Sequence, residues 1–387
     1  MSSKRSLPTL MVVVALLLGA CGGGEDEGAE VPRQDKQAVA ATYADLVLAA
    51  YDASIASTRT MQKDIDRFIA KPSAGTLKAA RKAWLAARDD YIPTEPFRFY
   101  GGPIDDPEDG PEGKINAWPM DEAYVDYVDG KPASGIVNDT KGYAKITADV
   151  IVEANERGGE TNISSGWHAI EFLLWGQDQS KDGPGNRPFT DYSIAPNARR
   201  RASYLRLTSQ QLIDDLLSVR EQWSPQGGEF RTTFLADPDR ALRRILRGIG
   251  ALNTGELAGE RMAVALESAE QEDEHSCFSD NTNADVVNDL KGIRMVYLAE
   301  FPGVTGASLH SLIAKVDADL AKRLRSQMDA TLAKAEGFPA TFETMLAAAE
   351  GSAEHKALAD EITAIEQQGD TLADAAKALK VKVGFEV

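Results

Sequence analysis

Residues 35–69 read DKQAVAATYADLVLAAYDASIASTRTMQKDIDRFI. Apolar side chains recur in this stretch every three or four residues, and charged or small polar residues occupy most positions between them. This spacing matches one turn of an α-helix, about 3.6 residues, so the apolar side chains would lie along one face of a long helix. The stretch therefore predicts an amphipathic helix whose apolar face packs against other helices.

The same periodicity recurs along most of the chain. It predicts further helices at residues 76–91, 120–128, 143–156, 164–175, 197–222, 239–272, 285–299, 307–334, 339–348 and 353–381. Two long segments rich in Pro and Gly, 92–118 and 176–196, interrupt the pattern, and loops of this length are more often functional than idle. Alternating strand-like runs are scarce. We therefore expect an all-α fold built from helix bundles.

A weak internal similarity divides the helical region, residues 35–387, at about 35–225 and 235–387. Each part has long helices, then an irregular segment with acidic residues (95–121 and 270–285), then an apolar helix. This order suggests two related up-down bundles packed together. A second bundle unrelated to the first is the alternative, because the spacings differ.

The N-terminus has the order of an export signal. Two basic residues precede an apolar run, and small residues then lead to Cys21. A cysteine at that position matches a lipobox, in which the thiol receives a lipid, so we expect a signal peptide at 1–20 and a lipidated flexible tether at 21–34. The alternative is an ordinary secretory signal with a chance cysteine. Because residue 22 is Gly and not Asp, we expect outer-membrane anchoring, facing the periplasm or the cell surface.

The charge balance restricts the partners. The chain has 42 basic and 60 acidic residues, a net charge of −18 at pH 7, and the predicted signal carries no acid. Nucleic acid is excluded as a partner because phosphate binding needs a basic surface, whereas cations are favoured. Apart from Cys21 the chain has one cysteine, Cys277, so we expect no internal disulfide in this exported protein.

Residues 166–176, GWHAIEFLLWG, hold the most informative pattern. The predicted helix is apolar nearly all round, which indicates burial, yet His168 and Glu171 lie three residues apart and therefore on one face. Burying both side chains without hydrogen-bond partners would destabilise the fold by roughly several kcal/mol. Either a metal ion or a hydrogen-bonded polar network must compensate, and the pattern alone leaves both open.

With this motif the chain resembles the imelysin-like proteins, whose hallmark Gly-x-His-x-x-Glu is matched by Gly166, His168 and Glu171. The resemblance runs from about residue 35 to near the end, and it is strongest for the iron-regulated branch of the family. It includes YIPTEPFRF (91–99), GPID (102–105), AWPMDE (117–122), GELAGER (255–261) and DEHSCFSDN (273–281). The resemblance implies an extracytoplasmic helix-bundle protein linked to iron acquisition. Members are also described as metallopeptidases, after a membrane protease that cleaves insulin.

Two of these runs supply further candidate metal ligands. Glu95 stands between two prolines that stiffen its backbone, so its carboxylate can be aimed, and it is our leading third ligand beside His168 and Glu171. His275 has several acidic neighbours in sequence, including Asp280, which would raise its proton affinity and could form a cation site. A solvated acidic loop is the alternative for this segment.

The remaining candidates form a possible charge network. Glu256 and Glu260 lie four residues apart on one helix face, where they repel each other unless a cation or an arginine lies between them. Arg98 or Arg261 could neutralise them in a structural network, and direct metal ligation is the alternative. Asp121 belongs to this set through the resemblance.

Three functions remain open from the sequence. The first is a metal-binding lipoprotein of iron uptake, with a divalent metal ion or iron as its cofactor. Its partners would be the metal ion or an iron complex, the membrane through the lipid anchor, and other iron-uptake components. The second is a metallopeptidase using His168 and Glu171, although a His-Glu-x-x-His segment is absent and a catalytic zinc normally has three protein ligands. The third is a metal-free module binding a small anion or peptide. We favour the first because oxygen ligands and an acidic chain suit iron or calcium.

Overall fold

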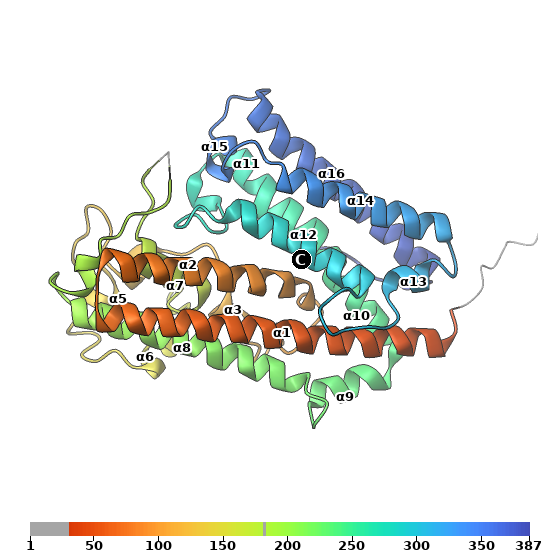
Figure 1. Ribbon diagram of the computed structural model, residues 1–387, viewed down its shortest axis with the longest axis horizontal. Helices are drawn as coiled ribbons and strands as arrows, with labels where there is room; N and C mark the ends of the chain where they lie inside the picture. Colours follow the sequence, from red (N-terminus) through yellow and green to blue (C-terminus); the bar gives the residue numbers. More distant parts are fainter. Residues whose placement is uncertain (1–30, 181–182) are drawn as a thin grey trace, which may run out of the picture.

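The computed structural model describes residues 31–180 and 183–387, and this part of the chain is all-α, as predicted (Figure 1). No strand forms within it, and the β-type contacts there are isolated bridges. The predicted signal peptide, Cys21 and most of the tether lie outside the described residues. Val31 is already buried, and the first helix begins at Arg33, so regular structure starts slightly before residue 35.

The first group of helices is α1 (Arg33–Ala70), α2 (Ala74–Tyr91), α7 (Gly166–Trp175) and α8 (Ala198–Gln222). α1 packs against α2 and α8, and α7 packs against the same two helices. Ser73 fixes the turn from α1 into α2, because its hydroxyl accepts the N–H of Thr76 while the Thr76 hydroxyl accepts the N–H of Ser73. By length and composition α1 could cross a membrane, but 61% of its most apolar window is buried inside the fold. It therefore serves as a core helix of this group.

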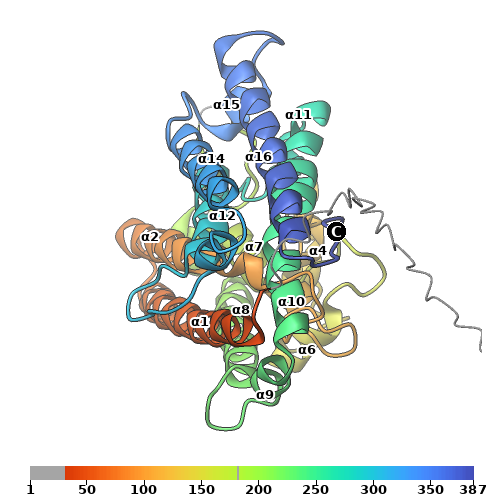
Figure 2. The ribbon, with the colours of Figure 1, turned by 90° about the vertical axis from the view of Figure 1, so that its right-hand side faces the viewer.

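The second group is α10 (Pro238–Ala251), α12 (Thr282–Leu298), α14 (Ala318–Glu336) and α16 (Ala353–Ala378). α10 continues directly into η3 (Leu252–Ala263), which is a π-helix, and then into α11 (Val264–Ser268). α16 packs against η3 and α14, and α14 packs against α12. Figure 2 shows the second group beside the first. We call the first group the first bundle and the second group the second bundle; α9 (Glu229–Ala236) lies between them in the chain.

Short helical elements occupy the connections. They are η1 (Ile92–Phe97), α3 (Glu112–Ile115), α4 (Glu122–Val125), α5 (Gly135–Asn138), α6 (Ala148–Ala154), η2 (Phe189–Tyr192), η4 (Gln271–Asp273), α13 (Leu309–Ile313) and α15 (Phe342–Leu346). The helices predicted at 120–128 and 143–156 are thus much shorter. The helix predicted at 307–334 is divided into α13 and α14, because Asp317 caps α14 by accepting the N–H of Leu320.

The two groups meet at η1, which packs against α10 and α12. Two glycines allow this close approach of backbones. A Cβ atom on Gly292 of α12 would lie 2.7 Å from the carbonyl oxygen of Pro93, and one on Gly248 of α10 would collide with the carbonyl oxygen of Pro96. The seam between the bundles therefore depends on the absence of side chains at these two positions.

This seam predicts the effect of adding one methyl group. Gly248→Ala should lower the free energy of unfolding by about 2–3 kcal/mol, because the backbone of η1 must move. Gly259→Ala is the matched control, since its Cβ would lie 3.4 Å from the nearest atom, the carbonyl oxygen of Thr254. Urea unfolding of both variants measures the difference. Equal stability of the two variants would contradict the tight contact at η1.

Candidate functional site

α7 carries the Gly-x-His-x-x-Glu motif, and every residue of the helix is buried. Gly166 begins it with φ of +81°, a conformation that favours glycine, and a side chain there would collide with the carbonyl oxygen of Ile115. The aromatic residues of the helix, among them Trp167 and Phe172, belong to the core, as the sequence predicts. The helix therefore presents His168 and Glu171 to a water-poor interior.

His168 and Glu171 form a pair with defined partners. His168 Nδ1 lies 2.9 Å from Glu171 Oε2. The other oxygen of Glu171, Oε1, accepts hydrogen bonds from the backbone N–H of Ser279 at 3.0 Å and from its hydroxyl at 2.6 Å. Ser279 lies in the turn before α12, so this pair connects the two bundles.

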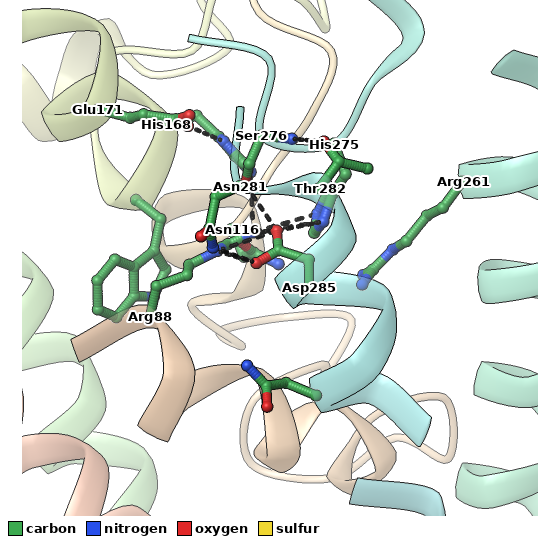
Figure 3. A network of polar contacts seen from close by, with 12 residues as sticks. Arg88, Asn116, His168, Glu171, Arg261, His275, Ser276, Asn281, Thr282 and Asp285 are labelled. Atoms are coloured by element: carbon green, nitrogen blue, oxygen red, sulfur yellow. Dashed lines mark hydrogen bonds and ion pairs between the residues drawn. The ribbon is translucent and has the colours of Figure 1, made fainter. Parts of the chain in front are cut away.

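Arg88 of α2 and Asp285 of α12 lie at the centre of the network (Figure 3). The guanidinium donates from Nη2 to Asp285 Oδ2 at 3.0 Å, and both side chains are almost completely buried. Asp285 also accepts hydrogen bonds from the Ser276 hydroxyl at 2.6 Å and from Asn281 at 3.0 Å. Arg88 donates its remaining edge to the side-chain oxygen of Asn116. The sharing of these groups satisfies a buried ion pair that would otherwise destabilise the fold.

Arg88 also contacts both imidazoles of the site. Its Nη2 lies 3.5 Å from His168 Nε2 and 3.3 Å from His275 Nδ1, and His275 Nδ1 lies 3.1 Å from Asp285 Oδ2. The ring centroids of the two histidines are 5.1 Å apart. The structure thus brings His275, which lies in the turn before α12, to the predicted His168–Glu171 pair, although His168 and His275 are 107 positions apart in the sequence.

The donor set at His168 fits a metal ion poorly in this arrangement. A guanidinium has only donors, so His168 Nε2 must accept from Arg88, and Nδ1 then carries the proton that it donates to Glu171. Neither ring nitrogen keeps a free lone pair, and a bound cation would lie beside the positive charge of Arg88. Of the two compensations that the sequence allows, the geometry favours the polar network.

Glu95 does not contact the His168–Glu171 pair. It is fully buried in a second cluster, where Oε2 accepts from Arg98 and from Arg261, each at 2.6 Å. Its other oxygen accepts from Asn116 at 3.3 Å, and Asn116 links it to Arg88. Burial opposes the charge of Glu95, yet the two arginines hold the pKa of its carboxyl well below the usual range. Glu95 is therefore an anion with cationic partners, which limits its use as a metal ligand.

The π-helix η3 adds Arg261 and Glu256 to this second cluster. Arg261 donates to Glu256 Oε1 at 2.8 Å and to Asp289 Oδ2 at 2.8 Å. Residues five apart point about 140° from each other in an α-helix, whereas the wider π turn brings them toward one face. Glu256 therefore pairs with Arg261, which is the arrangement expected if these charges form a structural network. Glu260 is exposed and does not share this pairing.

Burial corrects one expectation about His275. Its acidic neighbours in sequence were expected to raise its proton affinity, but burial and the nearby Arg261 lower the pKa of His275 to about 4. The carboxylate that His275 contacts is that of Asp285, which lies outside this run of acidic neighbours. Burial also raises the pKa of Glu171 to about 8 and, with Arg88, lowers that of His168 well below its usual value. The interior thus favours the neutral forms of both histidines and opposes the charge of Glu171.

A cleft of about 1130 Å³ opens above the network, between the loops of the first bundle and η3 of the second. His275 and Asn116 lie at its wall, and Trp118 separates it from His168, with 4.7 Å between the two ring centroids. Six carboxylates line the cleft: Glu112, Glu156, Glu160, Glu256, Glu260 and Asp273. Its two basic side chains, Arg98 and Arg261, are both engaged by carboxylates. The cleft is therefore strongly acidic.

Two predicted site residues lie outside this arrangement. Asp121 is exposed and caps α4, accepting the N–H of Ala123. Asp280 belongs to a separate cluster with Asp178 and Glu343, where one oxygen from each carboxylate lies within 4.8 Å of the others. Burial and Asp178 raise the pKa of Asp280 to about 7.

Four residues of the network, Arg88, Asn116, Ser279 and Asp285, were not predicted from the sequence. For Arg88 a signal was present: Leu77, Ala80, Trp84 and Tyr91 form the apolar face of α2, and Arg88 falls on the same face. A charged residue on an apolar face indicates a buried partner. Its partner lies 197 residues away, so the sequence does not identify it.

A family model described as Imelysin matches residues 47–372. Iron-regulated protein A of Synechococcus elongatus is 27% identical over 363 residues, which cover 93% of this chain and 89% of that protein. A crystal structure of a provisionally named iron-regulated protein A precursor from Parabacteroides distasonis has a TM-score of 0.68 at 18% identity, covering 90% of this chain and 97% of that one. An imelysin-like protein from Psychrobacter arcticum also has a TM-score of 0.68, at 14% identity, covering 92% and 99%. The two solved structures share the fold of this chain.

The lowered pKa of His275 predicts how stability changes with pH. Between its folded value of about 4 and its ordinary value of 6.5, the unfolded chain binds a proton that the folded chain does not. This contribution to stability is complete above pH 6.5 and is lost as the pH falls toward 4, by roughly 3 kcal/mol in total. Wild type should therefore lose its stability advantage over His275→Gln as the pH falls.

Urea unfolding at pH 7, 5.5 and 4 measures this advantage. His355→Gln, which removes a half-exposed imidazole outside the network, controls for the loss of a histidine elsewhere. A constant difference between wild type and His275→Gln across the three pH values would show that His275 is not buried in the neutral form.

Proposed function

The chain belongs to the imelysin family, and on that premise we propose that it is an extracytoplasmic, iron-linked binding protein that takes a cationic iron complex in the cleft between its two bundles. The family match and the relatives named iron-regulated protein A support the link to iron. The acidic lining and the size of the cleft support a cationic complex as the ligand.

The acidic lining of the cleft is the observation that carries this proposal. Six carboxylates face the cleft, and its two arginines are already paired with carboxylates. Low-dielectric walls with one sign of charge concentrate ligands of the opposite sign. Carboxylate oxygens are also the hard ligands that iron(III) and other hard cations prefer. A cation would therefore gain more from this cleft than an anion.

The size of the cleft favours a complex over a bare ion. A volume of about 1130 Å³ is slightly above the usual range of sites for small organic ligands, about 300–1,000 Å³, and far exceeds a coordination sphere. The wall also includes Trp118, Ala117 and Val264, which offer apolar contact to an organic shell around the metal. The network of Arg88 and Asp285 would hold this wall rigid instead of binding the metal itself.

Neither alternative function gains support from a specific contact. For an anion-binding module, Arg98 and Arg261 would have to be available, yet both already donate to carboxylates. For a metallopeptidase, His168 and Glu171 would have to hold a metal, yet each is engaged in the buried network. Proteolysis assays with and without a chelator separate the peptidase alternative from binding alone.

We further propose that the protein is exported and anchored by a lipid on Cys21, in the outer membrane. The residues around Cys21 support this location. In that position the protein would present its cleft to iron complexes and to other components of iron uptake. The lipid anchor would be its contact with the membrane.

The cleft proposal predicts a charge preference in binding. By calorimetry, a cationic iron(III) trihydroxamate complex should bind at least about tenfold more tightly than anionic iron(III) citrate. The double variant Glu156→Gln/Glu260→Gln, with one change on each side of the cleft, should weaken binding of the cationic complex about tenfold.

The matched control is Glu153→Gln/Glu267→Gln, which removes the same charge from exposed positions that do not line the cleft. It should bind like wild type. Tighter binding of the anionic complex, or equal affinities of the two double variants, would contradict a cation site in the cleft.

The anchoring proposal predicts that Cys21→Ser yields an unlipidated, soluble protein. The thiol of Cys21 is the proposed lipid acceptor, so its removal takes away the acyl chains that would hold the protein in the membrane. Fractionation of host cells, with detection of the protein in membrane and soluble fractions, measures the change. A variant that stays in the membrane fraction after a salt wash would argue against lipidation as the anchor.

A further inference from the structure

The last residues of the described chain, 381–387, follow α16 and lie against α10 and η3 without helix or strand structure of their own. In Figure 2 they are the dark blue end of the chain beside α10. Val381, Val383 and Phe385 pack against the core, and the residues between them are exposed. This alternation is typical of an extended chain with one face on a surface. We call these residues the 381–387 segment.

Two glycines provide the surface on which this segment lies. A Cβ atom on Gly250 of α10 would collide with the ring of Phe385, whose atoms are its nearest neighbours. A Cβ atom on Gly255 of η3 would lie 2.8 Å from Cγ1 and 3.0 Å from Cγ2 of Val387. The 381–387 segment therefore fills the space that two side chains would need, and it contacts the helix backbone closely.

Arg247 of α10 connects the segment to the chain that follows η1. Its Nη1 donates to the carbonyl oxygen of Gly384 at 2.7 Å, and its Nε donates to the carbonyl oxygen of Phe99 at 3.0 Å. Glu386 Oε2 lies 3.9 Å from the same Nη1, which adds an attraction between opposite charges. One guanidinium thus holds both the segment and the backbone next to Arg98.

Both attachment points are next to side chains of the acidic cleft. Phe99 follows Arg98 and Gly255 precedes Glu256, and Arg98 and Glu256 both line the cleft. Arg98 Nη1 lies 4.0 Å from Glu256 Oε1, so these two residues meet across the seam between the bundles. The 381–387 segment contacts Gly255 directly and Phe99 through Arg247, and none of its residues lines the cleft itself.

We propose that the 381–387 segment is a positioning element of the cleft, which holds Arg98 and Glu256 in the geometry that binds the cationic complex. This inference rests on the proposed function of the cleft. A wall that is in place before the ligand arrives loses less conformational freedom on binding, which strengthens the binding. The segment is attached by a few side chains at the surface, so it can detach while the helices stay folded. Detachment would then weaken ligand binding and promote release.

Gly250→Ala in the mature chain tests the proposal, because the new methyl group displaces Phe385 while alanine favours the helix itself. The hydrogen exchange of backbone amides in residues 252–263, measured without ligand, should become about tenfold faster. Binding of the cationic iron(III) trihydroxamate complex, measured by calorimetry, should become about tenfold weaker. The amides of α2 should keep their exchange rates, which shows that the fold is intact.

Phe385→Ala should have the same two effects, because it removes the contact from the other side. Once the ring is absent, adding Gly250→Ala should change exchange and affinity little further, so the effects of the two changes should not add. Lys382→Ala, on an exposed residue of the same segment, is the matched control and should behave like wild type.

Wild-type exchange and affinity in Gly250→Ala would overturn the proposal, and so would additive effects of the two changes. Faster exchange with unchanged affinity would show a purely structural contact and would also overturn it. A wild type that does not prefer the cationic complex would contradict the proposed function instead. In that case the exchange rates, which need no ligand, still decide whether the segment holds η3 in place.

Discussion

Arg88 of α2 and Asp285 of α12 form a buried ion pair that joins a helix of the first bundle to a helix of the second. Burying two charges away from water destabilises the fold by roughly several kcal/mol unless each remaining donor and acceptor has a hydrogen-bond partner. Here Ser276 and Asn281 donate hydrogen bonds to Asp285, and Asn116 accepts a hydrogen bond from Arg88. The aromatic rings of α2 and α7 surround the guanidinium. The positions of these helices and of the turn before α12 are therefore mutually dependent, since moving any one would leave a buried charge without its partner.

The histidine motif takes its role from this pair. In isolation His168 and Glu171 look like two metal ligands, but Arg88 occupies the ring nitrogen that a metal would need. Ser279, from the other bundle, donates two hydrogen bonds to the carboxylate of Glu171. The motif thus connects the two bundles through hydrogen bonds in the interior. Trp118 lies between this interior and the acidic cleft, which faces solvent. Separating a rigid polar interior from an open acidic surface gives the proposed ligand a preformed wall to bind against.

Backbone geometry at the seam serves the same arrangement. Gly248 and Gly292 let α10 and α12 touch η1, which places Glu95 beside Arg261. The π-helix then turns Glu256 toward Arg261, so that Arg98 and Arg261 are shared among several carboxylates. π-Helical segments are uncommon and often mark functional sites, and this one forms one side of the cleft. Of the carboxylates that line the cleft, Glu112 and Glu256 pair with these arginines, whereas no described ion pair joins an arginine to Glu156, Glu160, Glu260 or Asp273.

The sequence by itself determined the all-α class, the long helices and the burial of α7, because helical periodicity and an apolar helix are local properties of the chain. It also singled out His168, Glu171, Glu95, His275, Arg261 and Glu256, which all lie in the two linked clusters. Only the tertiary structure decided their partners. Arg88 and Asp285 are 197 residues apart, and the carboxylates around Asp280 come from three separate segments. A charged residue on an apolar face indicates that a partner exists, but its identity depends on which helices pack together. Whether a His and a Glu ligate a metal or bond to each other is decided by such distant neighbours, since these neighbours determine where the free lone pairs remain.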